Sequence, residues 1–99
     1  MIGFTPFAER QLDDLQQHYT TLQRPDALRR LIESVEAAMA KIERHPDDGL
    51  PAPRPYPELA RPGRAWVKAG RCWMSYQTTR PLVITGIFFD AADIPHRGE

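Results

Sequence analysis

The sequence has one cysteine and no long apolar run. A single cysteine cannot form a disulfide framework, which excludes the class of small disulfide-stabilised secreted domains. A membrane-spanning helix needs about 20 consecutive apolar residues, and the N-terminal MIGFTPFAER lacks the basic segment and apolar block of a secretory signal. These absences predict a soluble, cytoplasmic protein with no membrane partner, in which Cys72 is a small buried hydrophobe of a strand rather than a nucleophile.

Net charge is absent as well, and lysine is rare. The 13 basic side chains balance the 13 acidic ones, and only two of the basic residues are lysines. The balance hides an asymmetry, because residues 1–50 carry six basic and nine acidic side chains, whereas residues 51–99 carry seven and four. Residues 51–89 contain six basic residues and only one acidic residue, Glu58. This polarity favours a surface that meets an acidic macromolecule, although strands that simply contain more arginine would give the same count.

Two amphipathic helices are predicted in the N-terminal half. Thr5 and Pro6 are the residue types of a helix N-cap and a first helical position, and apolar residues then recur every three or four positions. The first stripe comprises Ala8, Leu12, Leu15, Tyr19 and Leu22. After a break at residues 23–25, a stronger stripe comprises Leu28, Leu31, Ile32, Val35, Ala38, Met39 and Ile42. The second helix ends before Pro46, and the short connection predicts an antiparallel helical hairpin.

Short strands are predicted in the C-terminal half, after an irregular connector. Residues 50–63 contain five of the ten prolines, too many for a regular element. We expect Tyr56 and Leu59 to hold this connector against the body of the domain. The predicted strands are residues 2–4, 64–68, 71–78 and 82–89, with Ala69-Gly70 as a two-residue hairpin turn.

The last strand is apolar on both faces, which is typical of a central strand. Strict alternation puts Leu82, Ile84 and Phe88 on one face and Val83, Ile87 and Phe89 on the other. Residues 90–99 follow as a polar tail. The order β-α-α-β-β-β predicts a single α+β domain over residues 1–99, in which the helical hairpin covers one face of a small, mainly antiparallel sheet.

This ordered set of features resembles the small toxins of bacterial toxin–antitoxin modules in the ParE/RelE superfamily, and the ParE branch in particular. The resemblance rests on the N-terminal strand before the first helix, the helix exit IERHPDDGLP, the arginine-led strand GRAWV, the segment WMSYQT, and the apolar strand VITGIFF followed by DAADIPHR. It covers nearly the whole chain. Its specificity lies in the order of the features, since no single motif among them is specific.

The resemblance implies a growth-inhibiting protein of a type II toxin–antitoxin, or plasmid-stabilisation, module that a cognate antitoxin holds silent. ParE-like toxins poison DNA gyrase and have no established hydrolytic activity, whereas RelE-like toxins cleave messenger RNA in the ribosome. No cofactor and no sequence-specific DNA binding by this chain alone are implied. An antitoxin segment would fold onto an apolar groove between the helices and a sheet edge, or the same surface would pair two copies into a homodimer.

A ribosome-dependent endoribonuclease needs a base, an acid and cations that stabilise the phosphorane charge. The candidate catalytic residues for that activity are Arg61, Arg64, Lys68, Arg71 and Tyr76, with a core position as the alternative for the tyrosine. After the last strand the family often has a histidine and an arginine, where this chain has Asp90 and Ala92. A carboxylate there would repel phosphate. This departure weakens the nuclease interpretation and also leaves open a non-toxic binding domain of the same fold.

A gyrase inhibitor needs no catalytic residue, only a surface for its target and a groove for its antitoxin. The predicted partner-binding residues are Arg64, Trp66, Lys68, Arg71, Trp73 and Phe89. In regular strands Trp66 shares a face with Arg64 and Lys68, and Trp73 shares one with Arg71. Tryptophan and arginine are enriched at interface anchors, and the alternative is that the tryptophans belong to the core.

No metal site is predicted. His45 lies where a helix ends, and a protonated imidazole there is favoured by the helix dipole alone. Asp47 and Asp48 follow it in a turn, where adjacent acids are usually solvated rather than bound to a cation. We therefore expect neither a metal ion nor a cofactor.

Overall fold

The elements follow one another in the predicted order, and we describe them from a computed structural model that covers residues 2–54 and 56–89. The strands are β1 (Gly3–Phe4), β2 (Arg64–Ala69), β3 (Cys72–Gln77) and β4 (Val83–Phe88). The helices are α1 (Pro6–Thr21) and α2 (Pro25–Arg44), and short 3-10 turns occupy Pro46–Asp48 and Pro57–Leu59. The α+β class is thus confirmed. The predicted polar tail, with Asp90 and Ala92, lies outside the described residues.

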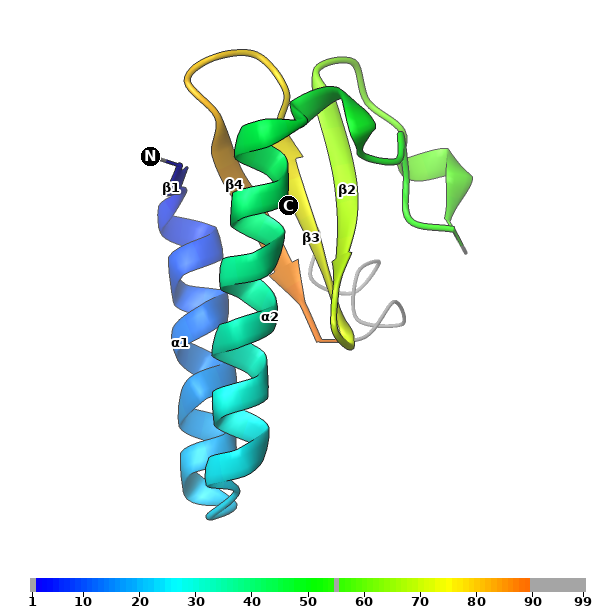
Figure 1. Cartoon of the computed structure of the whole chain (residues 1–99). Helices are drawn as coiled ribbons and strands as arrows, with labels where there is room; N and C mark the ends of the chain where they lie inside the picture. The colour runs from blue at the N-terminus through cyan, green and yellow to red at the C-terminus, as the bar shows by residue number, and fades with distance from the viewer. Residues whose placement is uncertain (1, 55, 90–99) are drawn as a thin grey trace.

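The four strands form one sheet in the order β1-β4-β3-β2 (Figure 1). β3 pairs antiparallel with β2 and β4, and β1 adds to the other side of β4 in parallel. β4 is therefore an inner strand, as its apolar sequence predicts. At the opposite edge of the sheet, Leu50 of the connector pairs with Trp66 of β2 through two backbone hydrogen bonds of 2.8 and 2.7 Å.

Local chemistry sets the start and the end of α1. The Oγ1 atom of Thr5 accepts a hydrogen bond from the Ala8 N–H at 3.1 Å, which confirms the predicted N-cap. The Thr5 N–H donates to the Ile84 carbonyl at 2.9 Å and so ties the start of the helix to β4. Between the helices, Gln23 adopts a left-handed φ of 56°, and Pro25 opens α2.

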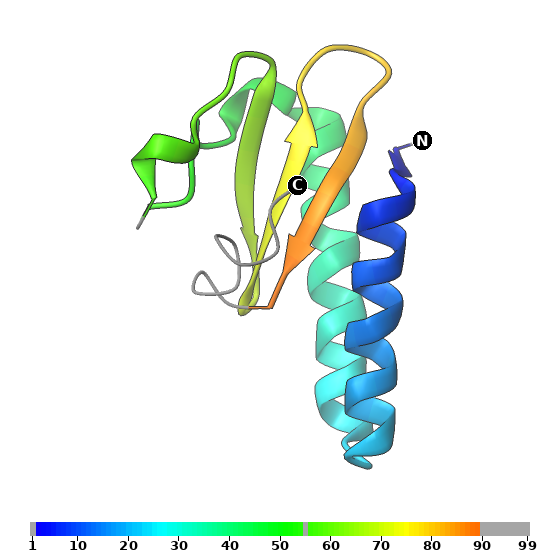
Figure 2. The same ribbon diagram turned by 180° about the vertical axis from the view of Figure 1, so that it is seen from behind.

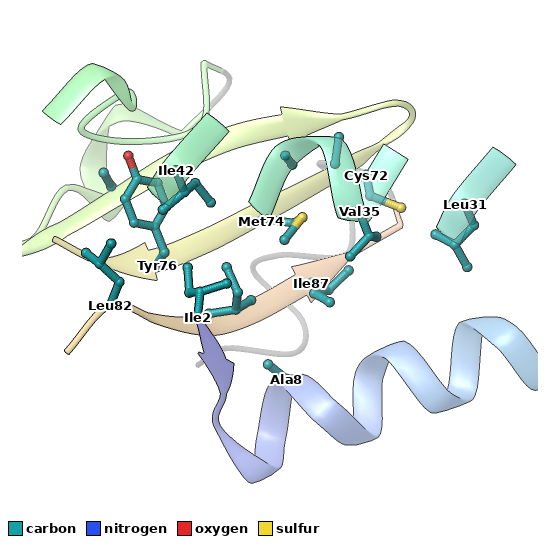
Figure 3. Packing of buried hydrophobic residues seen from close by; sticks show 14 residues of the cluster. Ile2, Ala8, Leu31, Val35, Ile42, Cys72, Met74, Tyr76, Leu82 and Ile87 are labelled. Carbon is teal, nitrogen blue, oxygen red and sulfur yellow. The ribbon is translucent and has the colours of Figure 1, made fainter. Parts of the chain in front are cut away.

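Both helices cover the same face of the sheet (Figures 1 and 2). α1 packs against β4, and α2 packs against β2. The main core fills the space between the two layers (Figure 3). Its sheet side comprises Ala65, Val67 and Ala69 of β2, Cys72, Met74 and Tyr76 of β3, and Ile84 and Ile87 of β4. We call the opposite face, which the helices leave uncovered, the far face.

The faces of β4 depart from strict alternation because of a β-bulge. The ladder between β3 and β4 shifts after Ser75, which leaves Thr85 without an opposing residue. The extra residue changes the phase of the strand, so that Ile84 and Ile87 both face the main core and Phe88 faces away from it. The prediction that Ile84 shares a face with Phe88 is therefore wrong.

The first hairpin turns one residue later than the sequence predicts. Ala69 pairs with Cys72, so the two turn residues are Gly70 and Arg71. Gly70 has a positive φ of 61° at the first turn position, which suits a type II′ turn. A Cβ on Gly70 would also lie 2.8 Å from the Ser34 Oγ. Arg71 therefore belongs to the turn and does not begin β3.

Candidate partner-binding surface

The far face of the sheet carries a second hydrophobic cluster. Trp66, Trp73 and Phe88 form it, with 1%, 5% and 1% of their surface exposed. The partly buried residues that pack against them are Phe7, Leu50, Tyr56 and Leu59. Three of these four belong to the connector, which therefore lies against the far face. The prediction that Tyr56 and Leu59 hold the connector in place is confirmed.

This burial assigns both tryptophans to the core. A ring with 5% or less of its surface exposed has little left to offer a partner, so the predicted contacts of Trp66 and Trp73 with another macromolecule find no support in the fold. The Trp66 Nε1 is a buried donor with no acceptor among the described residues. On this face, the side chains that can contact another macromolecule are therefore the charged neighbours of the tryptophans.

Three cations lie along the outer strand and the residues that lead into it. Arg64 and Lys68 alternate with the core-facing residues of β2 and so share the far-face side, as predicted. The Lys68 Nζ lies 5.2 Å from the centre of the Trp73 ring, within cation–π range. Burial, and then the nearby Arg61, lower the pKa of Arg64. We call Arg61, Arg64 and Lys68 the basic strip, and their proximity raises the positive potential of this side of the sheet.

Arg71 points elsewhere. Its guanidinium carbon lies 5.4 Å from the centre of the Phe89 ring. Phe89 packs against the main core, with its ring centre 6.3 Å from that of Tyr19 on α1. Arg71 therefore sits at the helix side of the β2–β3 turn. The prediction that Arg71 shares a face with Trp73 is wrong, because the turn displaces Arg71 from the strand.

Tyr76 belongs to the main core and links β3 to the turn after α2 through a hydrogen bond. It is 1% exposed, and its hydroxyl donates a hydrogen bond of 2.7 Å to the Pro46 carbonyl. Burial raises the pKa of Tyr76 above its ordinary value of 10.0, although a hydrogen bond with the Gly49 backbone acts in the opposite direction. The phenol is therefore protonated at neutral pH and engaged with the turn that follows α2. The core alternative for this residue is confirmed.

Cys72 is a buried thiol, as the sequence predicts. It is 2% exposed and belongs to the main core. Burial raises the pKa of Cys72, and the nearby Lys68 and Arg71 offset only part of this effect. A thiol of this kind is a poor nucleophile at neutral pH, because the thiolate is the reactive form.

A basic cavity next to the strip was not predicted from the sequence. It has a volume of ≈ 250 Å³ and lies between the end of α2, the connector and β2. The charged and titratable side chains that line it are Lys41, His45, Asp48, Arg54, Lys68 and Tyr76. They come from the end of α2 with the turn after it, the connector, β2 and β3, so no local pattern could have grouped them. Three cationic side chains against one carboxylate favour an anionic group of a partner.

Within the described residues, no three His, Cys, Asp or Glu side chains gather closely enough to hold a metal ion. Neither α1 nor α2 has the length and hydropathy that a bilayer crossing requires. Comparison with known proteins identifies no relative, because no protein-family model and no curated protein matches the chain.

Proposed function

We propose that this chain is the toxin of a type II toxin–antitoxin module of the ParE-like kind. It would arrest growth by binding DNA gyrase and would be silenced by a cognate antitoxin. The observation that carries the proposal is the arrangement of charge on the sheet. The helical hairpin covers one face, and the basic strip lies along the outer strand on the other side, where a macromolecule can reach it. This agrees with the architecture that the sequence resemblance implies.

The orientation of the candidate catalytic residues favours gyrase over messenger RNA. Tyr76 faces the main core, Lys68 lies on the far face, and Arg71 contacts Phe89 at the turn. Cleavage through a phosphorane requires a base, an acid and cations around one phosphate. Lys68 and Tyr76 line the same basic cavity, but the Tyr76 hydroxyl donates to Pro46 and Arg71 lies apart at the turn, so the candidate residues do not surround one phosphate. A surface that binds a protein requires no such convergence.

The antitoxin would bury apolar surface that the fold leaves open. Leu22 and Ile32 are the large hydrophobic residues that remain exposed in the described part of the chain, at 51% and 37%. A disordered segment that folds on binding pays an ordering cost, which burial of such side chains offsets. A homodimer would use the same surface, and the oligomeric state of the purified chain distinguishes the two.

Expression of the chain without a partner tests this proposal. We expect growth arrest, relaxed plasmid DNA because gyrase is inhibited, and intact messenger RNA. Colony counts, plasmid topology on agarose gels and mapping of transcript 5′ ends measure the three effects. Co-expression of a short neighbouring reading frame that encodes the antitoxin should restore growth.

The other outcomes assign the chain to the alternatives. Cleavage of ribosome-associated transcripts near their start codons, with normal plasmid topology, would identify a RelE-type endoribonuclease. Normal growth with unchanged topology and transcripts would overturn the toxin proposal in favour of a non-toxic binding domain of the same fold.

A further inference from the structure

A groove lies between the β2–β3 turn and the end of the helical hairpin at which α1 connects to α2. Both helices extend past the sheet at this end (Figures 1 and 2). The end of α1 and the start of α2 therefore face the turn across an opening of ≈ 380 Å³. Its apolar lining includes Tyr19, Leu22, Leu31, Ala69, Cys72 and Phe89. Leu22, at 51% exposed, is the most accessible large hydrophobic side chain in the described residues.

Three arginines lie along the same groove. Arg24 comes from the interhelical connection, Arg30 from α2 and Arg71 from the strand turn, and all three side chains are exposed. The residues that line the groove include no aspartate or glutamate. Arg29 differs from its neighbour Arg30, because it pairs with Asp26 at 3.2 Å and does not line the groove. The groove thus combines an apolar floor with cations from three elements.

We propose that this groove binds an acidic, amphipathic segment of a partner protein. Apolar side chains of the segment would cover Leu22 and the floor, because burial of exposed apolar surface is favourable. Its carboxylates would pair with Arg24, Arg30 and Arg71, since guanidinium groups bind carboxylates through paired hydrogen bonds. A nucleic acid would use the arginines but would leave Leu22 and the other aliphatic side chains of the floor uncovered.

The identity of the partner rests on the proposed function, under which the segment belongs to the antitoxin. The preference of the groove for acidic amphipathic segments does not rest on it. Peptide binding requires neither toxicity nor gyrase, so the two proposals fail independently. A chain that leaves growth unaffected can still select acidic peptides, and a toxic chain can fail to select them.

Selection from a random peptide library against the full chain tests the groove. We expect the enriched peptides to carry net negative charge together with leucine, isoleucine or phenylalanine. A fluorescent copy of an enriched peptide should bind the Arg24→Glu/Arg30→Glu double variant at least about tenfold more weakly than the wild type. Arg24→Glu places an acid at the N-cap of α2, where the helix dipole favours it, and the Arg30 side chain is exposed, so the variant should fold. Arg29→Glu is the matched control and should bind as the wild type does.

Four results of the peptide experiments would overturn the proposal. They are the absence of enriched peptides, enrichment of neutral or basic peptides, equal affinity of the double variant, and displacement of the peptide by an oligonucleotide of random sequence. A wild type that sediments as a dimer, with a double variant that sediments as a monomer, would also overturn the proposal. A second copy of the chain would then occupy the groove.

Discussion

Single buried polar side chains tie the elements of this small domain together. The Gln11 side chain is 6% exposed, and its Oε1 accepts a hydrogen bond of 2.8 Å from the Ile87 N–H. β1 pairs only with the start of β4, so this bond satisfies a backbone donor farther along the same edge. Tyr76 does the same for the Pro46 carbonyl beyond the end of α2. Both ties join segments that lie far apart in the sequence.

Removal of the Tyr76 hydroxyl should destabilise the fold. Tyr76→Phe leaves the partly buried Pro46 carbonyl without its donor, which we expect to lower the free energy of unfolding by about 1–3 kcal/mol. Urea denaturation followed by tryptophan fluorescence measures this loss. Tyr56→Phe is the control, because the Tyr56 hydroxyl has no hydrogen bond within the described residues. Unchanged stability of Tyr76→Phe would contradict the structural role.

The buried thiol should make stability depend on pH in the alkaline range. Burial raises the pKa of Cys72 above its ordinary value of 9.0, so the folded state keeps the proton more tightly than the unfolded chain. The stabilisation is complete below the unfolded pKa and is lost as the pH rises through the folded value. We expect the free energy of unfolding of the wild type to fall more steeply above pH 9.0 than that of Cys72→Ala. Identical slopes would show that the thiol is not buried.

At the scale of elements, the helices depend on periodicity and caps, whereas the strands depend on turns and a bulge. The N-cap and the two apolar stripes are local, so the sequence predicts α1 and α2 closely. The hairpin turn and the phase of β4 are decided by pairing across the sheet. Strict alternation cannot locate the extra residue Thr85. A glycine alone does not show whether it occupies the first or the second position of a two-residue turn.

The turn glycine should be sensitive to substitution. Gly70→Ala forces a side chain into a positive φ of 61° and places its Cβ 2.8 Å from the Ser34 Oγ. We expect a loss of about 1–3 kcal/mol in the free energy of unfolding, measured by thermal or urea denaturation. Gly3→Ala is the matched control, because nothing lies within 4 Å of its Cβ position. Equal stability of the two variants would show that β2 and β3 do not turn at Gly70.

For the molecule as a whole, the sequence shows which charged side chains are present, but it predicts the orientation of only some of them. The excess of arginine after residue 50 and the shared side of Arg64 and Lys68 follow from counting and alternation. The burial of the tryptophans depends on a connector whose path has no periodicity. The groove lined by Arg24, Arg30 and Arg71 depends on how far the helices extend past the sheet. Such juxtapositions arise from packing and leave no local pattern.

The central claim is that the basic strip of this domain holds another macromolecule. Its most direct test is the supercoiling activity of purified gyrase in the presence of the wild type, the Arg61→Glu/Lys68→Glu variant, or Arg29→Glu as a control. We expect the wild type and the control to inhibit supercoiling. The strip variant should require a concentration at least about tenfold higher for the same inhibition, which corresponds to about 1.4 kcal/mol of lost binding free energy. Full supercoiling at every concentration of the wild type, or equal inhibition by the strip variant, would contradict the account.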